Sequence, residues 1–327
     1  MMRRLINGLS IRNKFRLRFM LMTYLSVFLL GCTEKEQHLN LLFAGDMMLD
    51  RGTRKVIERK NIDYLFQEVK PVFLKQDAVL VNFEGTACDT RLSASSKAFC
   101  FRADTAWLPR LKHNGITAVS LANNHSGDFG SEGLRQTAAS LHNNKITTLG
   151  YQEQADPCAP FLLEKNDIHV AIFSSALLFE KEAAGSCHES DALLCKRISQ
   201  FKQQHPAYHV ILCLHWGIEM QLTPEKKQTE QAHAFIDAGA DLIIGHHPHV
   251  VQPIEQYKNK YIFYSLGNFI FDNEQSPSNK GIFGCFSVTA KHIELKEVIP
   301  FTITHSKPML MNTKEAAQFL KPFSPSF

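Results

Sequence analysis

Short apolar runs alternate along the chain with longer segments that carry apolar residues on one helical face. The runs have the length of buried strands, and the longer segments have the 3.6-residue period of amphipathic helices. Strands that alternate with helices are typical of a layered α/β domain rather than an all-β sandwich. The expected strands are Leu39–Ala44, Ala78–Val81, Ile116–Leu121, Val170–Phe173, Val210–Leu214, Leu242–Ile244 and Tyr261–Leu266, with helices near 104–114, 131–144, 190–204 and 225–238.

A different pattern occupies the first 31 residues. Six basic residues and no acidic one precede an apolar run from Phe19 to Leu30, which is too short for an ordinary membrane-spanning helix. This pattern predicts a signal peptide over residues 1–31. The run ends in Leu-Leu-Gly-Cys, which resembles a bacterial lipobox and implies cleavage before Cys32 and lipidation of Cys32. Thr33 then favours the periplasmic side of the outer membrane in a Gram-negative cell. The alternative is an uncleaved signal anchor with an incidental cysteine.

Removal of the signal peptide changes the charge of the chain. The whole sequence has 36 basic and 32 acidic residues, and cleavage leaves 30 basic residues against the same 32 acidic ones. A nearly neutral chain without a basic patch is not expected to bind nucleic acid, and no second apolar run is long enough to span a membrane. We therefore expect a short tether at 32–38, one domain at 39–310 and a C-terminal tail at 311–327.

Export also bears on the other seven cysteines, because an oxidising compartment permits disulfides. Polar, loop-like sequence separates Cys88 from Cys100 and Cys187 from Cys195, which makes these two pairs disulfide candidates. Cys158 could instead pair with Cys187 or Cys195, since sequence does not fix connectivity.

Polar residues follow five of the predicted strands at the point where each strand ends. Each residue alone has another explanation as a helix cap or a turn residue, but their recurrence favours a common site. Ligands of open α/β sheets bind at the carboxyl ends of the strands, and a mixture of carboxylate, amide and imidazole groups suits Mn, Fe or Zn. The segments are Ala44-Gly45-Asp46, Asn82-Phe83-Glu84-Gly85, Asn123-Asn124-His125 with Asp128, His215-Trp216-Gly217-Ile218-Glu219, and the histidine-rich turn after Ile244.

That turn holds the densest chemistry in the chain. His246, His247 and His249 leave a short buried strand together, in a tight turn around Pro248. Imidazole is the commonest protein ligand for a catalytic divalent metal, and two histidines one residue apart can place their rings at one point. The alternative is a histidine-rich surface turn.

Six motifs together resemble the CapA family of bacterial capsule and poly-γ-glutamate synthesis proteins, which is related to the calcineurin-like metallophosphoesterases. They occur in the family's order between about Leu39 and Asp272. The resemblance implies a metallophosphatase-like fold, a four-layer α-β-β-α sandwich in which two mixed sheets pack face to face. The motifs are AGDMMLDRG, VNFEG, ANNHSGDFG, HWGIE, GHHPHVVQ and YSLGNFIFD.

Carried over residue by residue, the resemblance also implies a metal site and a proton donor. His125 matches the histidine that protonates the leaving group or stabilises the transition state, helped here by Asp128. Met48 stands where the phosphoesterase pattern has a histidine, and Glu84 where it has a bridging aspartate, so the site is expected to hold either one or two divalent ions. The implied metal ligands are Asp46, Glu84, Asn124, His215, His247 and His249.

Further residues near these motifs are candidates for binding the substrate, namely Arg102, Glu219 and Asn268. Arg102 could hold an anionic group with two hydrogen bonds or form an ordinary ion pair.

The expected function is that of a lipid-anchored, metal-dependent hydrolase or transferase, of the metallophosphoesterase-like superfamily, acting on a cell-envelope polymer such as poly-γ-glutamate or on a capsule precursor. Its expected partners are that polymer, the membrane through the lipid anchor, and a membrane synthase complex. Two alternatives stay open, a non-catalytic polymer-binding scaffold of an envelope synthesis complex and a metal-dependent phosphodiesterase. Metal content separates the scaffold from the two enzymes.

Overall fold

The computed structural model describes residues 37–153, 155–178 and 185–323. The expected signal peptide and the lipidation site Cys32 lie outside these residues. Within the described part, no helix combines the length and the apolar character needed to cross a membrane.

The first of two large sheets is mixed and has eight strands: β1 (Leu39–Met47), β2 (Ala78–Phe83), β5 (Ala118–Ser120), β6 (Thr147–Leu149), β13 (Asn268–Ile270), β14 (Lys280–Val288), β15 (Ile293–Thr304) and β16 (Lys307–Leu310). Their order is β16–β15–β14–β1–β2–β5–β6, and β13 also pairs with β1. Strands β1, β2, β5 and β6 are parallel, whereas β14, β15 and β16 are each antiparallel to their neighbours. The carboxyl ends of β1, β2 and β5 therefore meet at one edge of the sheet.

The second sheet is also mixed and has six strands: β7 (Phe161–Lys165), β8 (Ile168–Ala176), β9 (His209–His215), β10 (Leu242–His246), β11 (Ile254–Tyr257) and β12 (Lys260–Phe263). Strands β8, β9, β10 and β12 are parallel, with β7 and β11 antiparallel at the two edges. A small additional sheet pairs β3 (Thr86–Ala87) with β4 (Arg102–Ala103).

The layers follow from the alternation of side chains along the buried strands. In β1, Leu41 and Phe43 belong to the core between the two sheets, together with Ile211 of β9. The neighbouring Leu42 and Ala44 point the other way, into the core between the first sheet and its helices.

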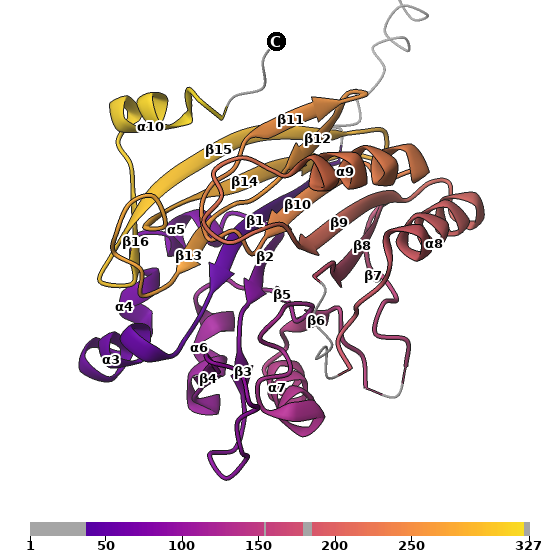
Figure 1. The fold of residues 1–327 in the computed structure, drawn as a ribbon. Helices are drawn as coiled ribbons and strands as arrows, with labels where there is room; N and C mark the ends of the chain where they lie inside the picture. The colour runs from indigo at the N-terminus through magenta and orange to yellow at the C-terminus, as the bar shows by residue number, and fades with distance from the viewer. Residues whose placement is uncertain (1–36, 154, 179–184, 324–327) are drawn as a thin grey trace, which may run out of the picture. The chain divides into compact units, whose positions relative to one another are not determined.

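Helices cover the outer face of each sheet. Ile57 and Leu134 belong to the core outside the first sheet, and Leu194 and Phe235 to the core outside the second, where α8 and α9 lie together (Figure 1). The fold is therefore the expected four-layer α-β-β-α sandwich. The helices are α3 (Arg51–Lys60), α4 (Asp63–Phe66), α5 (Lys70–Phe73), α6 (Leu108–His113), α7 (Gly130–Asn143), α8 (Asp191–Gln204), α9 (Lys226–Ala238) and α10 (Thr313–Leu320), with a short 3₁₀ helix at Thr105–Trp107.

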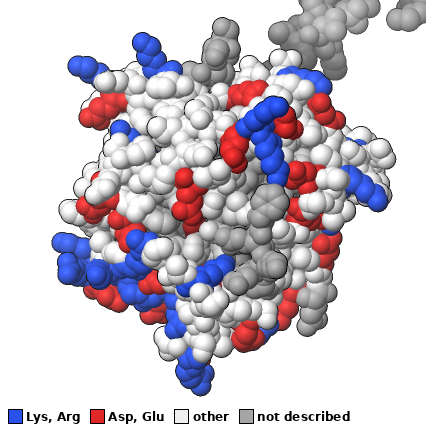
Figure 2. All heavy atoms as spheres, in the orientation of Figure 1, with Lys and Arg blue, Asp and Glu red and all other residues white. Residues whose placement is uncertain are grey.

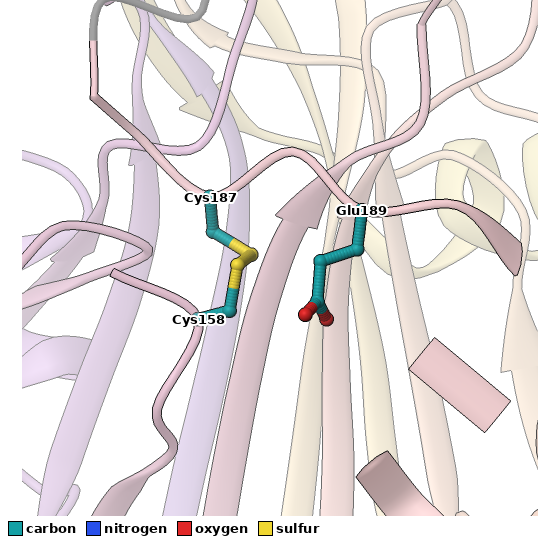
Figure 3. Close-up of side chains that lie close together, drawn as sticks. All are labelled: Cys158, Cys187 and Glu189. Atoms are coloured by element: carbon teal, nitrogen blue, oxygen red, sulfur yellow. A yellow bond between two sulfur atoms is a disulfide. The ribbon is translucent and has the colours of Figure 1, made fainter. Parts of the chain in front are cut away.

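The described cysteines form one disulfide, which joins Cys158 to Cys187 with their Cα atoms 4.8 Å apart (Figure 3). Cys187 thus pairs with the partner that the sequence had left as an alternative, and not with Cys195, which lies on α8 and is a free, half-buried thiol. The two bonded cysteines pack against Ala122. Glu189 lies beside them and accepts hydrogen bonds from Arg197, but both sulfurs are bonded to each other and cannot act as thiolate ligands, so this group is not a candidate metal site.

The expected pair of Cys88 and Cys100 is also wrong, because both are free thiols in the structure. Each has a local partner: the Cys88 thiol donates to the Thr86 hydroxyl at 3.8 Å, and the Cys100 thiol donates to the carbonyl of Ser95 at 3.8 Å. Loop-like sequence between two cysteines indicated that they could approach each other, but it did not fix the directions of their side chains.

Candidate metal centre

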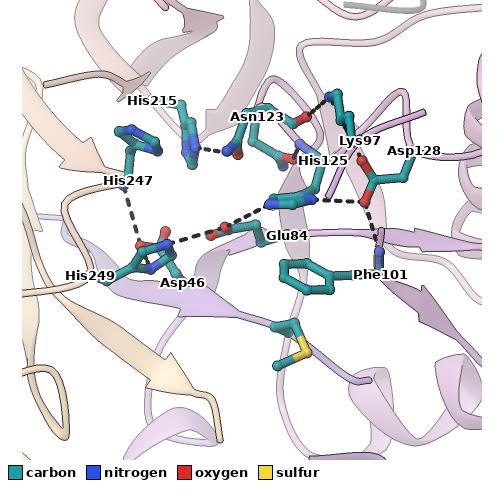
Figure 4. Close-up of polar contacts among 12 residues, drawn as sticks. Asp46, Glu84, Lys97, Phe101, Asn123, His125, Asp128, His215, His247 and His249 are labelled. Atoms are coloured by element: carbon teal, nitrogen blue, oxygen red, sulfur yellow. Dashed lines mark hydrogen bonds and ion pairs between the residues drawn. The ribbon is translucent and has the colours of Figure 1, made fainter. Parts of the chain in front are cut away.

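The core of the candidate site consists of Asp46, Glu84 and His215. Asp46 lies near the end of β1, Glu84 directly after β2, and His215 ends β9, so the three come from the carboxyl edges of both large sheets. Each side chain is at most 1% exposed, and their ligand atoms all lie within 4.8 Å of one another. Figure 4 shows these side chains pointing toward one another. The strand ends thus converge as the sequence predicts.

The histidine-rich turn brings its side chains to the same place. His247 and His249 both have a left-handed backbone, with φ of 98° and 57°. This conformation costs roughly 1–2 kcal/mol for a residue other than glycine. It is held by a hydrogen bond from the His247 amide to Asp46 Oδ2 at 3.3 Å and by one from the Met220 amide to the Pro248 carbonyl at 2.8 Å. Strain that persists at such a turn is typical of functional sites.

Asp46 is the hub of the polar contacts. Its Oδ1 accepts a hydrogen bond from Asn82 at 2.8 Å and lies 3.4 Å from His246 Nδ1, while its Oδ2 lies 3.5 Å from His249 Nδ1. Burial alone would raise the pKa of this carboxyl, but the contacts with His246 and His249 hold its pKa well below the usual value. Asp46 is therefore ionised at neutral pH and available to a cation.

Glu84 and His249 form a second buried contact, with Glu84 Oε1 3.5 Å from His249 Nε2. Burial raises the pKa of Glu84 to about 7. Burial opposes protonation of His249, yet the carboxylates of Glu84 and Asp46 raise its pKa to about 10. The protonated imidazole thus supplies the positive charge that the two carboxylates need, and a bound cation would replace that proton.

Two other imidazoles, those of His215 and His247, have the protonation state that a metal requires. Burial lowers the pKa of His215 well below its usual value and lowers the pKa of His247 to about 4. Both are neutral at pH 7. His215 Nε2 lies 2.9 Å from Asn124 Oδ1, so these two candidate ligands reach the same point.

Several buried atoms in this cluster lack a hydrogen-bond partner. They are Glu84 Oε1, His246 Nδ1 and His247 Nδ1. Buried polar atoms in native proteins are nearly always paired, and three such exceptions at one place call for an explanation. A divalent ion would satisfy Glu84 Oε1 and His247 Nδ1, whereas His246 Nδ1 lies 3.4 Å from Asp46 Oδ1. The carboxylate, amide and imidazole donors suit Mn, Fe or Zn. The residues therefore fit a metal.

Metal binding at this centre should become tighter as the pH rises. His249 keeps its proton up to about pH 10, and a metal can bind the imidazole only after that proton leaves. Between about pH 7.5 and 9 we expect the apparent affinity for Mn²⁺ to rise about tenfold per pH unit, and His249→Gln to abolish most of this rise. Calorimetry in buffers of different ionisation enthalpy measures the released proton. A pH-independent affinity in the parent would contradict the assignment.

His125 lies beside the cluster and is paired with Asp128. Its Nδ1 donates to Asp128 Oδ2 at 2.7 Å, its Nε2 lies 3.8 Å from Glu84 Oε1, and its ring stacks on Phe101 with 4.0 Å between centroids. The Phe101 amide donates to the same Asp128 oxygen at 2.7 Å. These contacts fix the ring with one nitrogen on Asp128 and the other facing the cluster (Figure 4).

The three residues expected to bind substrate differ in their surroundings. The Arg102 guanidinium donates to the carbonyls of Thr90 (2.9 Å) and Leu92 (2.5 Å) and lies over the Phe129 ring, so it holds a loop. That it binds an anion stays a prediction. Asn268 is fully buried, and its Oδ1 accepts from His249 Nδ1 at 2.9 Å, so it orients a candidate ligand.

Glu219 is exposed and lies in the loop after His215, where its charge still reaches Glu84. Its position at the edge of the site leaves it available to a substrate.

Sequence reasoning missed two residues of the site, Lys97 and Phe101, and gave no role to Asn82. Asn82 belongs to one of the five polar segments at strand ends, and its side chain donates to Asp46 Oδ1. Lys97 and Phe101 lie in the loop between β3 and β4, which no strand pattern connects with the site.

Two mixed sheets between helical layers, with a buried cluster of carboxylates and imidazoles at the strand ends, define an α/β protein with the metallophosphatase fold. A putative 5'-nucleotidase from Staphylococcus aureus superposes with a TM-score of 0.51 at 14% identity, covering 88% of this chain and 58% of that chain. A phosphatase from Mycoplasma pneumoniae superposes with a TM-score of 0.50 at 13% identity, covering 88% of this chain and 100% of that chain. At these identities the likeness shows the fold alone.

The chain belongs to the family described as "Bacterial capsule synthesis protein PGA_cap", whose family model matches residues 40–273. It is 31% identical to the PGA biosynthesis protein CapA of Bacillus subtilis over 286 residues, which cover 84% of this chain and 74% of that protein. It is 29% identical to the capsule biosynthesis protein CapA of Bacillus anthracis over 286 residues, covering 84% and 70%. The resemblance that the six motifs indicate is thereby confirmed.

Proposed function

We propose that this protein is a metal-dependent hydrolase or transferase that acts on a cell-envelope polymer, such as poly-γ-glutamate, or on a capsule precursor. The observation that carries the proposal is the buried cluster of Asp46, Glu84 and His215 beside the paired His125 and Asp128, in a chain of the capsule synthesis family. The proposal includes attachment to the membrane through a lipid on Cys32, which would place the site next to a membrane synthase.

The metal would be held by residues from five strand ends. Bound there, a divalent ion would lower the pKa of a water molecule and stabilise negative charge on the reacting oxygens. The buried walls of the site strengthen these electrostatic effects, because they exclude water. The residues that would hold one or two ions are Asp46, Glu84, Asn124, His215, His247 and His249.

His125 would act as the general acid. Its Nδ1 is fixed by Asp128, and its Nε2 faces Glu84 and the cluster, so a proton on Nε2 points to where a leaving group would lie. Asp128 holds the imidazole in this orientation.

A basic helix near the site supports the proposal of an anionic substrate. Helix α3 contains five basic residues and one acidic residue, and Figure 2 shows Lys and Arg side chains gathered where Figure 1 places this helix. Its first residue, Arg51, lies over the Phe101 ring, 5.7 Å from the centroid, and Phe101 stacks on His125. The basic helix thus adjoins the general acid. Arg51 pairs with Asp272 and Arg54 with Asp50, and the charge of the other three basic residues of the helix would attract a chain of carboxylates.

The test is a comparison of substrates on protein loaded with Mn²⁺. We expect cleavage or transfer of γ-linked glutamyl oligomers, and we expect His125→Gln to reduce kcat at least about 100-fold, since general acids contribute that much. Mass spectrometry of the products measures the reaction. Lys226→Gln, at an exposed residue of α9, is the control and should match the parent.

Other outcomes of this experiment assign the other functions. Turnover of a phosphodiester such as bis(p-nitrophenyl) phosphate, with none of γ-glutamyl oligomers, would make the protein a phosphodiesterase, in line with its fold. Binding of poly-γ-glutamate without turnover by the metal-loaded protein would make it a scaffold.

A further inference from the structure

Asp128 is a buried carboxylate whose two oxygens have different surroundings. Its side chain is fully buried. Oδ2 accepts hydrogen bonds from His125 Nδ1 and from the Phe101 amide, both at 2.7 Å. Oδ1 is buried without a hydrogen-bond partner, and Lys97 Nζ lies 3.7 Å from it. An ionised carboxylate at zero exposure needs a nearby positive charge, and Lys97 supplies one.

Lys97 reaches a second part of the site as well. Its ammonium donates to the backbone carbonyl of Asn124 at 2.5 Å, and its side chain is 19% exposed (Figure 4). One compact cation with three donors thus contacts both the backbone of a candidate metal ligand and the carboxylate that orients His125. Lys97 lies between β3 and β4, in a loop that is further attached by the Ser95 amide, which donates to the Asp128 carbonyl at 2.8 Å.

We propose that Lys97 is a positioning residue, which fixes Asp128 and the Asn124 backbone so that His125 keeps its Nδ1–H on Asp128 and its Nε2 toward Glu84. The role of His125 rests on the function proposed above, whereas the effect of Lys97 on the hydrogen bond does not. Removing the ammonium leaves a buried carboxylate oxygen with neither a cation nor a hydrogen bond. The carboxylate would then turn, and the His125 hydrogen bond would open more often.

The experiment is nuclear magnetic resonance on full-length metal-free protein with ¹⁵N-labelled histidine. The Nδ1–H proton of His125, assigned by its loss in His125→Gln, should be visible and slow to exchange with water. In Lys97→Met we expect its exchange rate to rise about tenfold or more, because local opening becomes more frequent. Lys97→Arg keeps the charge and should restore most of the slow exchange. Lys226→Met, at a lysine whose side chain is 91% exposed, is the matched control.

The proposal is overturned if His125 exchanges in Lys97→Met at the rate of the parent. Lys97→Gln guards against loss of folding in the methionine variant, since it can still donate to the Asn124 carbonyl but has no charge. Fast exchange in this variant supports the proposal, and parental exchange overturns it.

A second readout separates this proposal from the function on which it rests. In Lys97→Met, metal content should stay at the parental level, because the lysine is no ligand, while kcat should fall about tenfold or more with little change in KM. A parent that binds no metal would end the proposed function and leave the exchange result valid. If the parent is an active enzyme, a parental kcat in Lys97→Met would overturn the role of Lys97 and leave the proposed function standing.

Discussion

Replacing Gly45 with alanine should destabilise the protein by about 3 kcal/mol or more. A Cβ atom at this position would lie 1.8 Å from the carbonyl oxygen of Gly267 and 2.9 Å from its carbonyl carbon, both of which belong to the backbone. Backbone atoms cannot move aside as a flexible side chain would. The neighbouring Asp46 amide also donates to the Gly267 carbonyl at 3.1 Å, so the methyl group would separate β1 from the segment leading into β13.

This loss would reach the candidate site as well as stability. Asn268 follows Gly267 and orients His249, while Asp46 follows Gly45, so both sides of the centre would shift. Urea denaturation of the parent and the variant measures the stability. Gly130→Ala is the matched control: a Cβ there meets nothing within 4 Å, and its φ of +67° costs only about 1–2 kcal/mol. An equal loss of stability in Gly45→Ala and Gly130→Ala would contradict the close contact between Gly45 and the Gly267 backbone.

Replacing Asp46 with asparagine should weaken the binding of Mn²⁺ at least about 100-fold. The substitution keeps the shape of the side chain and removes the negative charge at the hub of the cluster. Substitution of a residue that only hydrogen-bonds to a metal ligand lowers metal affinity by up to about 100-fold, and substitution of a ligand itself should lower it at least as much. Asparagine would also face Asn82 Nδ2 and the imidazoles of His246 and His249 with an amide in place of a carboxylate. Equilibrium dialysis measures the affinity.

The control for this variant is Asp63→Asn, which removes a half-exposed carboxylate of α4 that pairs with Arg110 of α6. It should leave metal affinity unchanged. Parental affinity in Asp46→Asn would remove Asp46 from the ligands and shift the centre toward His215 and His247.

The layered architecture could be predicted because its central strands are buried on both faces and read as continuous apolar runs. Strand β9, with the sequence HVILCLH, is buried at every position and was found in this way. Its carboxyl end then placed His215 in the site. Asp46 and Glu84 were found in the same way, because ligands of open α/β sheets bind at the carboxyl ends of the strands. The position of the centre could therefore be predicted without knowledge of any side-chain contact.

Strands whose apolar pattern is interrupted, and loops, were harder to predict. Strand β15 is half exposed over its first residues, where charged side chains interrupt the apolar pattern, and it was missed. Its partner β14 was missed too, although β14 is buried after its first residue. Lys97 and Phe101 lie in a loop whose path over Asp128 depends on two hydrogen bonds. The Ser95 amide donates to the Asp128 carbonyl, and the Phe101 amide donates to the Asp128 carboxylate. No local pattern encodes such long-range contacts, and the same reason explains why the cysteine pairing could not be derived.

The metal content of purified protein tests the central claim most directly. Protein lacking residues 1–32, prepared without chelator or histidine tag, should carry a near-stoichiometric divalent metal by mass spectrometry. The double variant His247→Ala/His249→Ala should lose it, because the turn supplies two imidazoles beside Asp46 and Glu84. A folded parent that contains no metal and takes up no Mn²⁺, Fe²⁺ or Zn²⁺ would contradict both the metal centre and the proposed hydrolase or transferase function.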